Sequence, residues 1–86
     1  MEIVTLNQPT SFKDKSGRLR FEITCLLPNG TKKSLLNTTE SNYSEVKNAV
    51  VNIFLKDGFR APQSEIAKYI NRGAGTHGSA LVMTKG

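Results

Sequence analysis

The sequence has few residues that could cross-link a fold through disulfides or metal ions. It contains one cysteine, Cys25, one histidine, His77, and no tryptophan. A single thiol cannot form an internal disulfide, and Cys25 with His77 supplies too few ligands for a structural zinc site. We therefore expect no metal and no cofactor, and a fold that is stabilised by packing alone.

Long apolar runs and a recognisable leader are also missing. No stretch approaches the ~20 apolar residues of a membrane span, and the Met1–Val4 segment lacks a charged-then-apolar signal pattern. We expect a cytoplasmic protein with no membrane partner. With 86 residues, of which 37% are hydrophobic and 22% charged, the chain is expected to form a single small α+β domain over residues 1–86.

The first half of the sequence predicts antiparallel strands. Alternate residues from Leu19 to Leu27 are apolar, which predicts one buried face (Leu19, Phe21, Ile23, Cys25, Leu27) and one solvated face. Pro28-Asn29-Gly30-Thr31 predicts a tight hairpin turn, because Asn-Gly tolerates positive φ angles. With residues 31–37 as the return strand and a further strand within Glu2–Phe12, this half is expected to be a three-stranded antiparallel meander.

The second half changes to helical spacing. Tyr43, Val46, Val50, Ile53 and Phe54 form an apolar stripe, with Ala49 beside it, that predicts a helix to about Lys56, with Gly58 as its stop. A shorter helix is expected from Pro62 to about Asn71. Residues 79–84 are compatible with a closing strand or a short helix. The predicted fold is therefore a meander packed on two C-terminal helices, with a short closing strand as an option, in the order β-β-β-α-α-β.

No motif in the sequence fixes a chemistry. Gly73–Gly78 matches G-x-G-x-x-G, but a predicted helix precedes it, whereas dinucleotide binding needs a preceding strand. Two interpretations remain, namely a connector that ends the helix and a loop that holds a phosphate with Arg72 and His77. The carboxylates are scattered and Cys25 lies on the buried parity, so we expect no catalytic residues and no enzyme.

Basic residues form the more suggestive pattern. Twelve Lys and Arg against seven Asp and Glu give a net charge of +5, which favours anionic partners. In a meander we expect the cations around the central strand to lie close together and to form a ribbon that enters a DNA major groove. The predicted nucleic-acid-binding residues are Lys13, Lys15, Arg18, Arg20, Lys32 and Lys33, extended by Arg60 and Arg72. The competing interpretation is charge that protects an edge strand from pairing with other chains.

The order of these features resembles that of the arm-binding domains of phage integrases. The shared features are Gly17-Arg18-Leu19-Arg20-Phe21, the Asn29-Gly30 turn, Lys32-Lys33 and a helix around Ala49. The resemblance covers about residues 3–57 and implies a three-stranded sheet, packed on one helix, that enters the major groove. The second helix and the glycine-rich tail depart from it. Size and composition fit a regulator from a phage or mobile element.

Two alternatives stay open. Ser64–Ile70 looks like the first helix of a helix-turn-helix, with a second helix from about Thr76, although Arg72 and the glycines oppose that pattern. The other alternative is a protein-interaction module, an adaptor or inhibitor that binds an acidic protein and forms a homodimer. Leu26 and one of Leu35 and Leu36 motivate it, because they fall on solvated positions of the predicted sheet.

Overall fold

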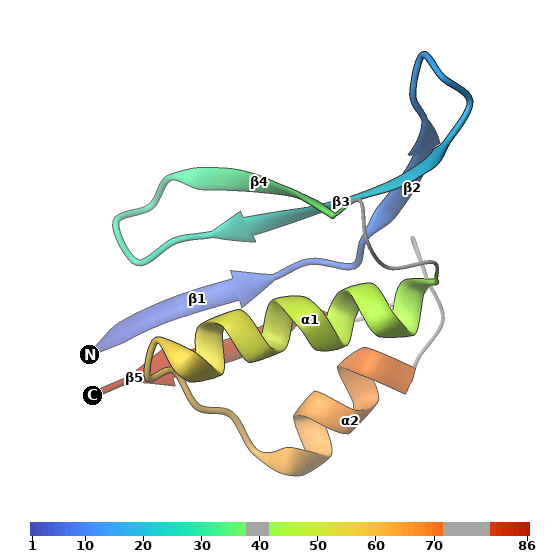
Figure 1. Cartoon of the computed structure of the whole chain (residues 1–86). Helices are drawn as coiled ribbons and strands as arrows, with labels where there is room; N and C mark the ends of the chain where they lie inside the picture. Colours follow the sequence, from blue (N-terminus) through green and yellow to red (C-terminus); the bar gives the residue numbers. More distant parts are fainter. Residues whose placement is uncertain (38–41, 72–79) are drawn as a thin grey trace.

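The computed structural model describes residues 1–37, 42–71 and 80–86 and confirms the α+β class (Figure 1). Four strands come first, followed by two helices and a last strand. In chain order these are β1 (Glu2–Leu6), β2 (Thr10–Lys13), β3 (Leu19–Leu26), β4 (Lys32–Asn37), α1 (Tyr43–Lys56), α2 (Gln63–Asn71) and β5 (Leu81–Lys85).

Every strand pair in the sheet is antiparallel, and β3 is the central strand. On one side β3 pairs with β4, and on the other side it pairs first with β2 and then with β1. The region Glu2–Phe12 thus forms two strands, where a single one was expected. Asn7-Gln8-Pro9 separates them, because Pro9 has no backbone N–H to donate to a ladder. The chain still follows β3, since the Asn7 backbone nitrogen donates to the Thr24 carbonyl at 3.1 Å.

The C-terminal segment closes the sheet, as one of the two expectations for it predicted. β5 pairs with β1 from Glu2 opposite Lys85 to Leu6 opposite Leu81. The helix-turn-helix alternative is therefore wrong, because its second helix would have to occupy residues that form a strand. The low content of β-branched residues in β5 left this choice open at the level of the sequence.

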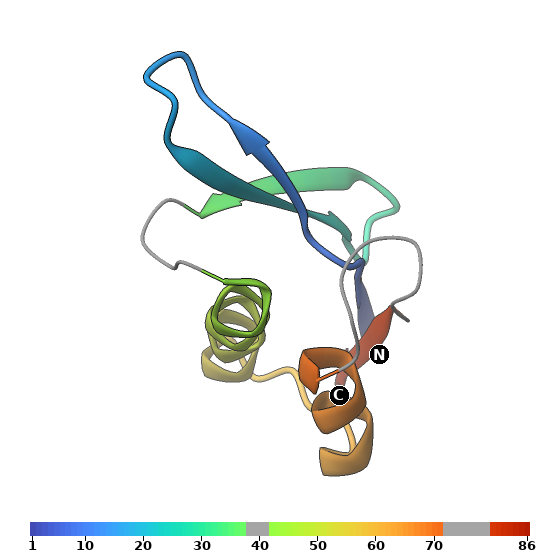
Figure 2. The same ribbon diagram turned by 90° about the vertical axis from the view of Figure 1, so that its right-hand side faces the viewer.

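Both helices cover the same face of the sheet, which we call the inner face (Figures 1 and 2). α1 begins after Asn42, whose side chain accepts a hydrogen bond from the Glu45 backbone nitrogen at 2.9 Å, and it ends before Gly58, which has a φ of +101°. No helix in the described part of the chain is long and apolar enough to cross a membrane. The buried core consists of Val4, Leu6, Phe21, Ile23, Cys25, Val46, Val50, Val51, Phe59, Ile66, Tyr69, Leu81 and Met83.

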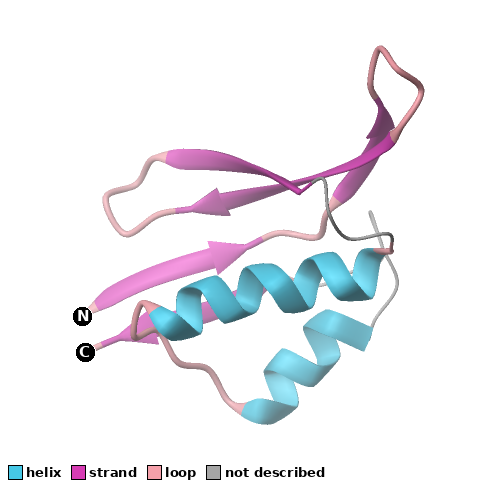
Figure 3. Ribbon diagram, viewed as in Figure 1, coloured by secondary structure: helices cyan, strands magenta, loops and turns pink. Residues whose placement is uncertain are grey.

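The predicted burial along β3 holds over most of its length and fails at one end. Phe21, Ile23 and Cys25 are buried as expected, but Leu19 is 50% exposed. The reason is visible in Figure 3, where the hairpin formed by β2 and β3 extends beyond the layer of helices. Leu19 occupies an inner-face position at which no helix lies beneath the sheet.

Candidate nucleic-acid interface

The extended part of the sheet is a two-stranded ribbon that carries the densest cluster of basic residues. We call residues 10–22 the basic hairpin. Its register runs from Thr10 opposite Glu22 to Lys13 opposite Leu19. The turn between the strands contains Gly17 at φ +82°, a value that side chains other than glycine rarely adopt.

Asp14 organises this turn through its carboxylate. Oδ1 accepts hydrogen bonds from the Ser16 hydroxyl at 2.6 Å, the Ser16 backbone nitrogen at 2.9 Å and the Arg18 backbone nitrogen at 3.0 Å. These bonds and the contact with Arg20 hold the pKa of Asp14 far below its usual range, with the Ser16 hydroxyl as the largest cause. The turn therefore has a defined shape that its own acidic residue maintains.

Arg20 is part of the same arrangement. Its Nε donates to Asp14 Oδ2 at 2.6 Å, and the two side chains are only 27% and 22% exposed. Arg20 is one of the predicted nucleic-acid-binding residues, and the structure places its guanidinium against a carboxylate of the same hairpin. Arg20 therefore stabilises the ribbon, and the free cations lie closer to the turn.

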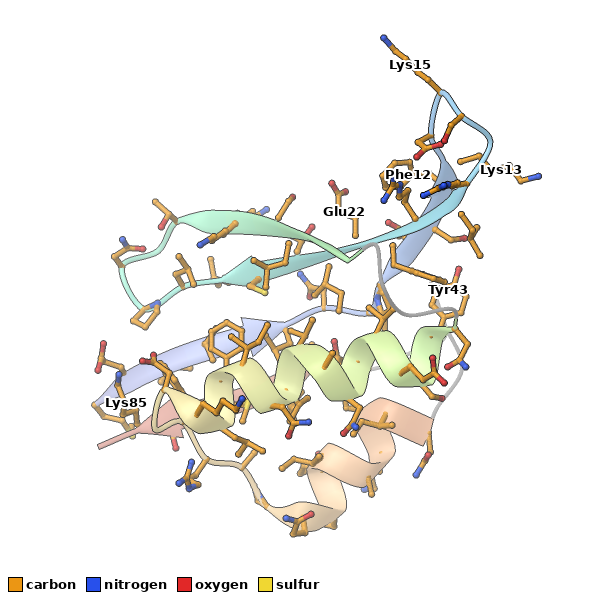
Figure 4. The ribbon with its side chains drawn as sticks, in the orientation of Figure 1. Phe12, Lys13, Lys15, Glu22, Tyr43 and Lys85 are labelled. Carbon is orange, nitrogen blue, oxygen red and sulfur yellow. The ribbon has the colours of Figure 1, made fainter. Side chains whose placement is uncertain are left out.

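Three cations project from the end of the hairpin. Lys13, Lys15 and Arg18 are exposed, and Figure 4 shows Lys15 and Lys13 pointing outward from the turn. Within the described residues, no carboxylate forms an ion pair with any of the three. Four cations and one carboxylate fall within residues 13–20, so this end of the molecule is strongly positive.

Lys32 and Lys33 lie elsewhere, so the expectation that all these cations lie close together is wrong. Lys32 is opposite Leu26 and Lys33 is opposite Cys25, at the far end of β3 from Arg20. Six strand positions separate the rows of Arg20 and Lys32, roughly 20 Å along the strand. The physical reason is the antiparallel order of the strands. The two turns lie at opposite ends of β3, so Lys32 and Lys33, which directly follow the second turn, lie far from the first.

Of the two remaining predicted residues, the structure describes only Arg60, which does not extend the patch. Arg60 forms a bridge with Thr84 of β5, and its guanidinium donates to the carbonyls of Leu55 and Phe59, both at 2.8 Å. Arg60 thus caps a carbonyl group at the C-terminal end of α1, and it lies beside β5, at the other edge of the sheet from β4. Arg72 and the Gly73–Gly78 loop with His77 lie outside the described residues.

No family model matches this chain. No curated protein and no solved structure is significantly similar to it either. The resemblance to integrase arm-binding domains thus rests on composition and element order alone.

Two residues of the basic hairpin were not singled out from the sequence. Asp14 opens the segment Asp14-Lys15-Ser16-Gly17, and an aspartate two residues before a serine is a signal for a side chain that bonds to its own turn. Phe12 carried no such signal. It is exposed on the same face as Arg20, its register partner, which puts an aromatic ring next to the cations.

Cys25 is a core residue, as its parity predicted. Its side chain is fully buried, and burial raises the pKa of the thiol to about 11, although the charge of Lys33 opposes that shift. In the described part of the chain, no three His, Cys, Asp or Glu side chains gather closely enough to hold a metal ion.

A buried polar cluster supports the base of the hairpin. Lys47 of α1 is buried, which lowers its pKa, and its Nζ donates to Gln8 Oε1 at 3.1 Å. The Tyr69 hydroxyl of α2 donates to the Asn7 carbonyl at 2.7 Å, and Lys47 Nζ lies 5.6 Å from the centre of the Tyr69 ring. Both helices thus hold the break between β1 and β2, the point from which the hairpin extends.

Proposed function

We propose that this protein binds duplex DNA through the basic hairpin, with Lys13, Lys15 and Arg18 contacting phosphates. The observation that carries the proposal is the combination of three exposed cations with a ribbon that extends beyond the helices. Because each neutralised phosphate releases condensed counterions, such a cluster favours binding to a polyanion strongly at low salt.

The shape of the hairpin favours DNA over RNA. A B-DNA major groove is about 12 Å wide and admits a two-stranded ribbon. The major groove of an RNA duplex is deep and narrow, and side chains cannot read it. The Asp14 carboxylate supports this proposal as well, since it is occupied by Ser16, Arg18 and Arg20 and its charge is largely offset within the turn.

The test compares three double variants that all lower the net charge by two. Lys15→Gln with Arg18→Gln removes charge from the hairpin, Lys32→Gln with Lys33→Gln removes it from the far end of the sheet, and Lys56→Gln with Lys68→Gln removes it from the helices. Fluorescence anisotropy with a labelled random-sequence duplex gives the affinity at several salt concentrations. We expect the hairpin variant alone to lose roughly tenfold or more at low salt, and its slope of log K against log salt to become shallower by about 2.

Two outcomes would contradict the proposal. If the wild-type protein does not bind the duplex even at low salt, the hairpin is not a DNA-binding element. If the three double variants lose affinity equally, binding follows net charge, and the position of the hairpin has no part in it.

A further inference from the structure

The face of the sheet opposite the helices, here the outer face, is covered by neither α1 nor α2 and carries an apolar patch. Leu26 of β3, Thr5 of β1 and Val82 of β5 lie side by side in one row of the register, and Ile3 of β1 follows on the same face. Leu26 is 40% exposed, Ile3 43% and Val82 51%. Aliphatic side chains from three adjacent strands therefore meet on one open surface, which typically marks an interaction site.

The row Leu26–Thr5–Val82 contains no charged side chain, although the chain has a net charge of +5. A nucleic acid would gain little from contact with this row, and an acidic protein would find no cation within it. A second copy of the chain is different, because two strongly positive molecules can approach most closely through surfaces that carry no charge.

We propose that the outer face binds a second copy of this chain. The twofold axis of this dimer runs parallel to β1, midway between the two facing sheets. Rotation about that axis places Leu26 of each copy over Val82 of the other and Ile3 over its own counterpart. The patch is therefore self-complementary, as the interface of a twofold dimer must be. Stacked sheets lie about 10 Å apart with strand directions within about 30°, which allows these side chains to interdigitate.

The order of the strands places the nearest cations at the rim of this interface. β5 is one strand away from β1, whereas β4 lies two strands away on the other side. In the proposed dimer β4 therefore lies beyond β5 of the facing copy, beside the bridge between Arg60 and Thr84. Lys32, which is opposite Leu26 in the register, then falls at the rim, where a cation remains solvated.

This arrangement has a consequence for the hairpins. An axis that runs along β1 preserves the direction of that strand in both copies. The basic hairpin follows the C-terminal end of β1, so the two hairpins of a dimer project from the same end of the assembly. The dimer itself does not depend on the proposed DNA binding, since it uses a different surface.

The test is the mass of the protein in solution without DNA. Sedimentation velocity over increasing concentration should show the mass rising from 9.4 kDa toward twice that value. Val82→Lys should raise the dissociation constant of the dimer at least tenfold. Ile53→Lys is the matched control: it adds the same charge at an aliphatic residue that is 57% exposed on α1, in the helical layer, and it should leave the dissociation constant unchanged.

Ile3→Lys serves as a second variant in case Val82→Lys does not fold, with the thermal transition in circular dichroism as the check. A wild-type protein that stays monomeric at every concentration would overturn the proposal. The proposal would also be overturned if the Val82→Lys and Ile3→Lys proteins fold and dimerise as tightly as the wild type.

Discussion

Asp14 shows how one carboxylate determines the properties of a basic surface. It accepts three hydrogen bonds across its own turn and a charge-assisted one from Arg20, so a negative group inside the cluster gives the cations a fixed framework. Without the Asp14 carboxylate, Lys15 and Arg18 would lie on a loop of less definite shape. Asp14 thus lowers the positive charge of the hairpin and at the same time orders the turn that carries these cations.

Replacement of Asp14 should loosen the turn while it makes the hairpin more positive. For Asp14→Asn we expect faster hydrogen exchange at the Ser16 and Arg18 amides, since both donate to Oδ1. Glu22→Gln removes the same charge from β3 at a position away from the turn, and it should leave these two amides unchanged. Exchange measured by NMR distinguishes the two variants, and equal protection in Asp14→Asn and wild-type protein would contradict the role assigned to Asp14.

The same turn should respond to acid in a defined direction. The folded pKa of Asp14 is depressed, so its contribution is fully present above the unfolded value of about 3.9 and is lost as the pH falls below that value through the folded pKa. The exchange of the Ser16 and Arg18 amides, corrected for its intrinsic pH dependence, should accelerate only in that acidic range, and in Asp14→Asn this acceleration should be absent.

At the scale of elements, the break between β1 and β2 depends on a few polar contacts from the helices. Tyr69 contributes its hydroxyl to the Asn7 carbonyl, and Lys47 contributes its ammonium group to Gln8. Asn7, Gln8 and Pro9 do not continue a regular ladder, and the Tyr69 hydroxyl gives the Asn7 carbonyl a hydrogen bond in place of a backbone partner. The direction of the hairpin is therefore set by side chains of both helices as well as by the sheet.

Tyr69→Phe isolates one of these contacts without a cavity. The ring remains beneath Lys47, and only the bond to the Asn7 carbonyl is lost, so the free energy of unfolding should fall by about 1–2 kcal/mol. Tyr43→Phe is the matched control, because the Tyr43 hydroxyl donates to Ser11 at an exposed position, and it should cost less than about 0.5 kcal/mol. Urea denaturation measures both, and equal losses would mean that Asn7 does not depend on Tyr69.

Sequence periodicity predicted the elements better than it predicted their surroundings. The alternation of β3 and the apolar stripe of α1 are local signals, and both elements form as predicted. The predicted buried faces are wrong at Leu19 and at Ile53, which are 50% and 57% exposed. Leu19 has the same local pattern as Phe21, but its burial depends on where the helices end, which no spacing encodes. Likewise, the separation of Lys32 from Arg20 follows from the paths of two turns, and the Asp14–Arg20 pair follows from the register of the hairpin.

At the scale of the whole molecule, the basic hairpin and the apolar patch of the outer face are separate surfaces. The free cations of the hairpin lie at one end, the helices cover the inner face, and the uncharged row of the outer face lies between β3 and β5. A protein with this distribution can associate through one surface and still present its charge on another. The two proposals therefore make a joint prediction that neither makes alone.

A dimer with both hairpins at one end should contact more phosphates than a monomer with a single hairpin. The slope of log K against log salt reports the number of phosphates neutralised, at about 0.9 per contact. In DNA binding measured well above the dimer dissociation constant, the slope for the wild type should be about twice that for Val82→Lys. Ile53→Lys, with the same added charge, should retain the wild-type slope. If the Val82→Lys and Ile53→Lys slopes are equal while the first variant is monomeric, each hairpin binds DNA independently, and the two hairpins of a dimer do not engage one duplex.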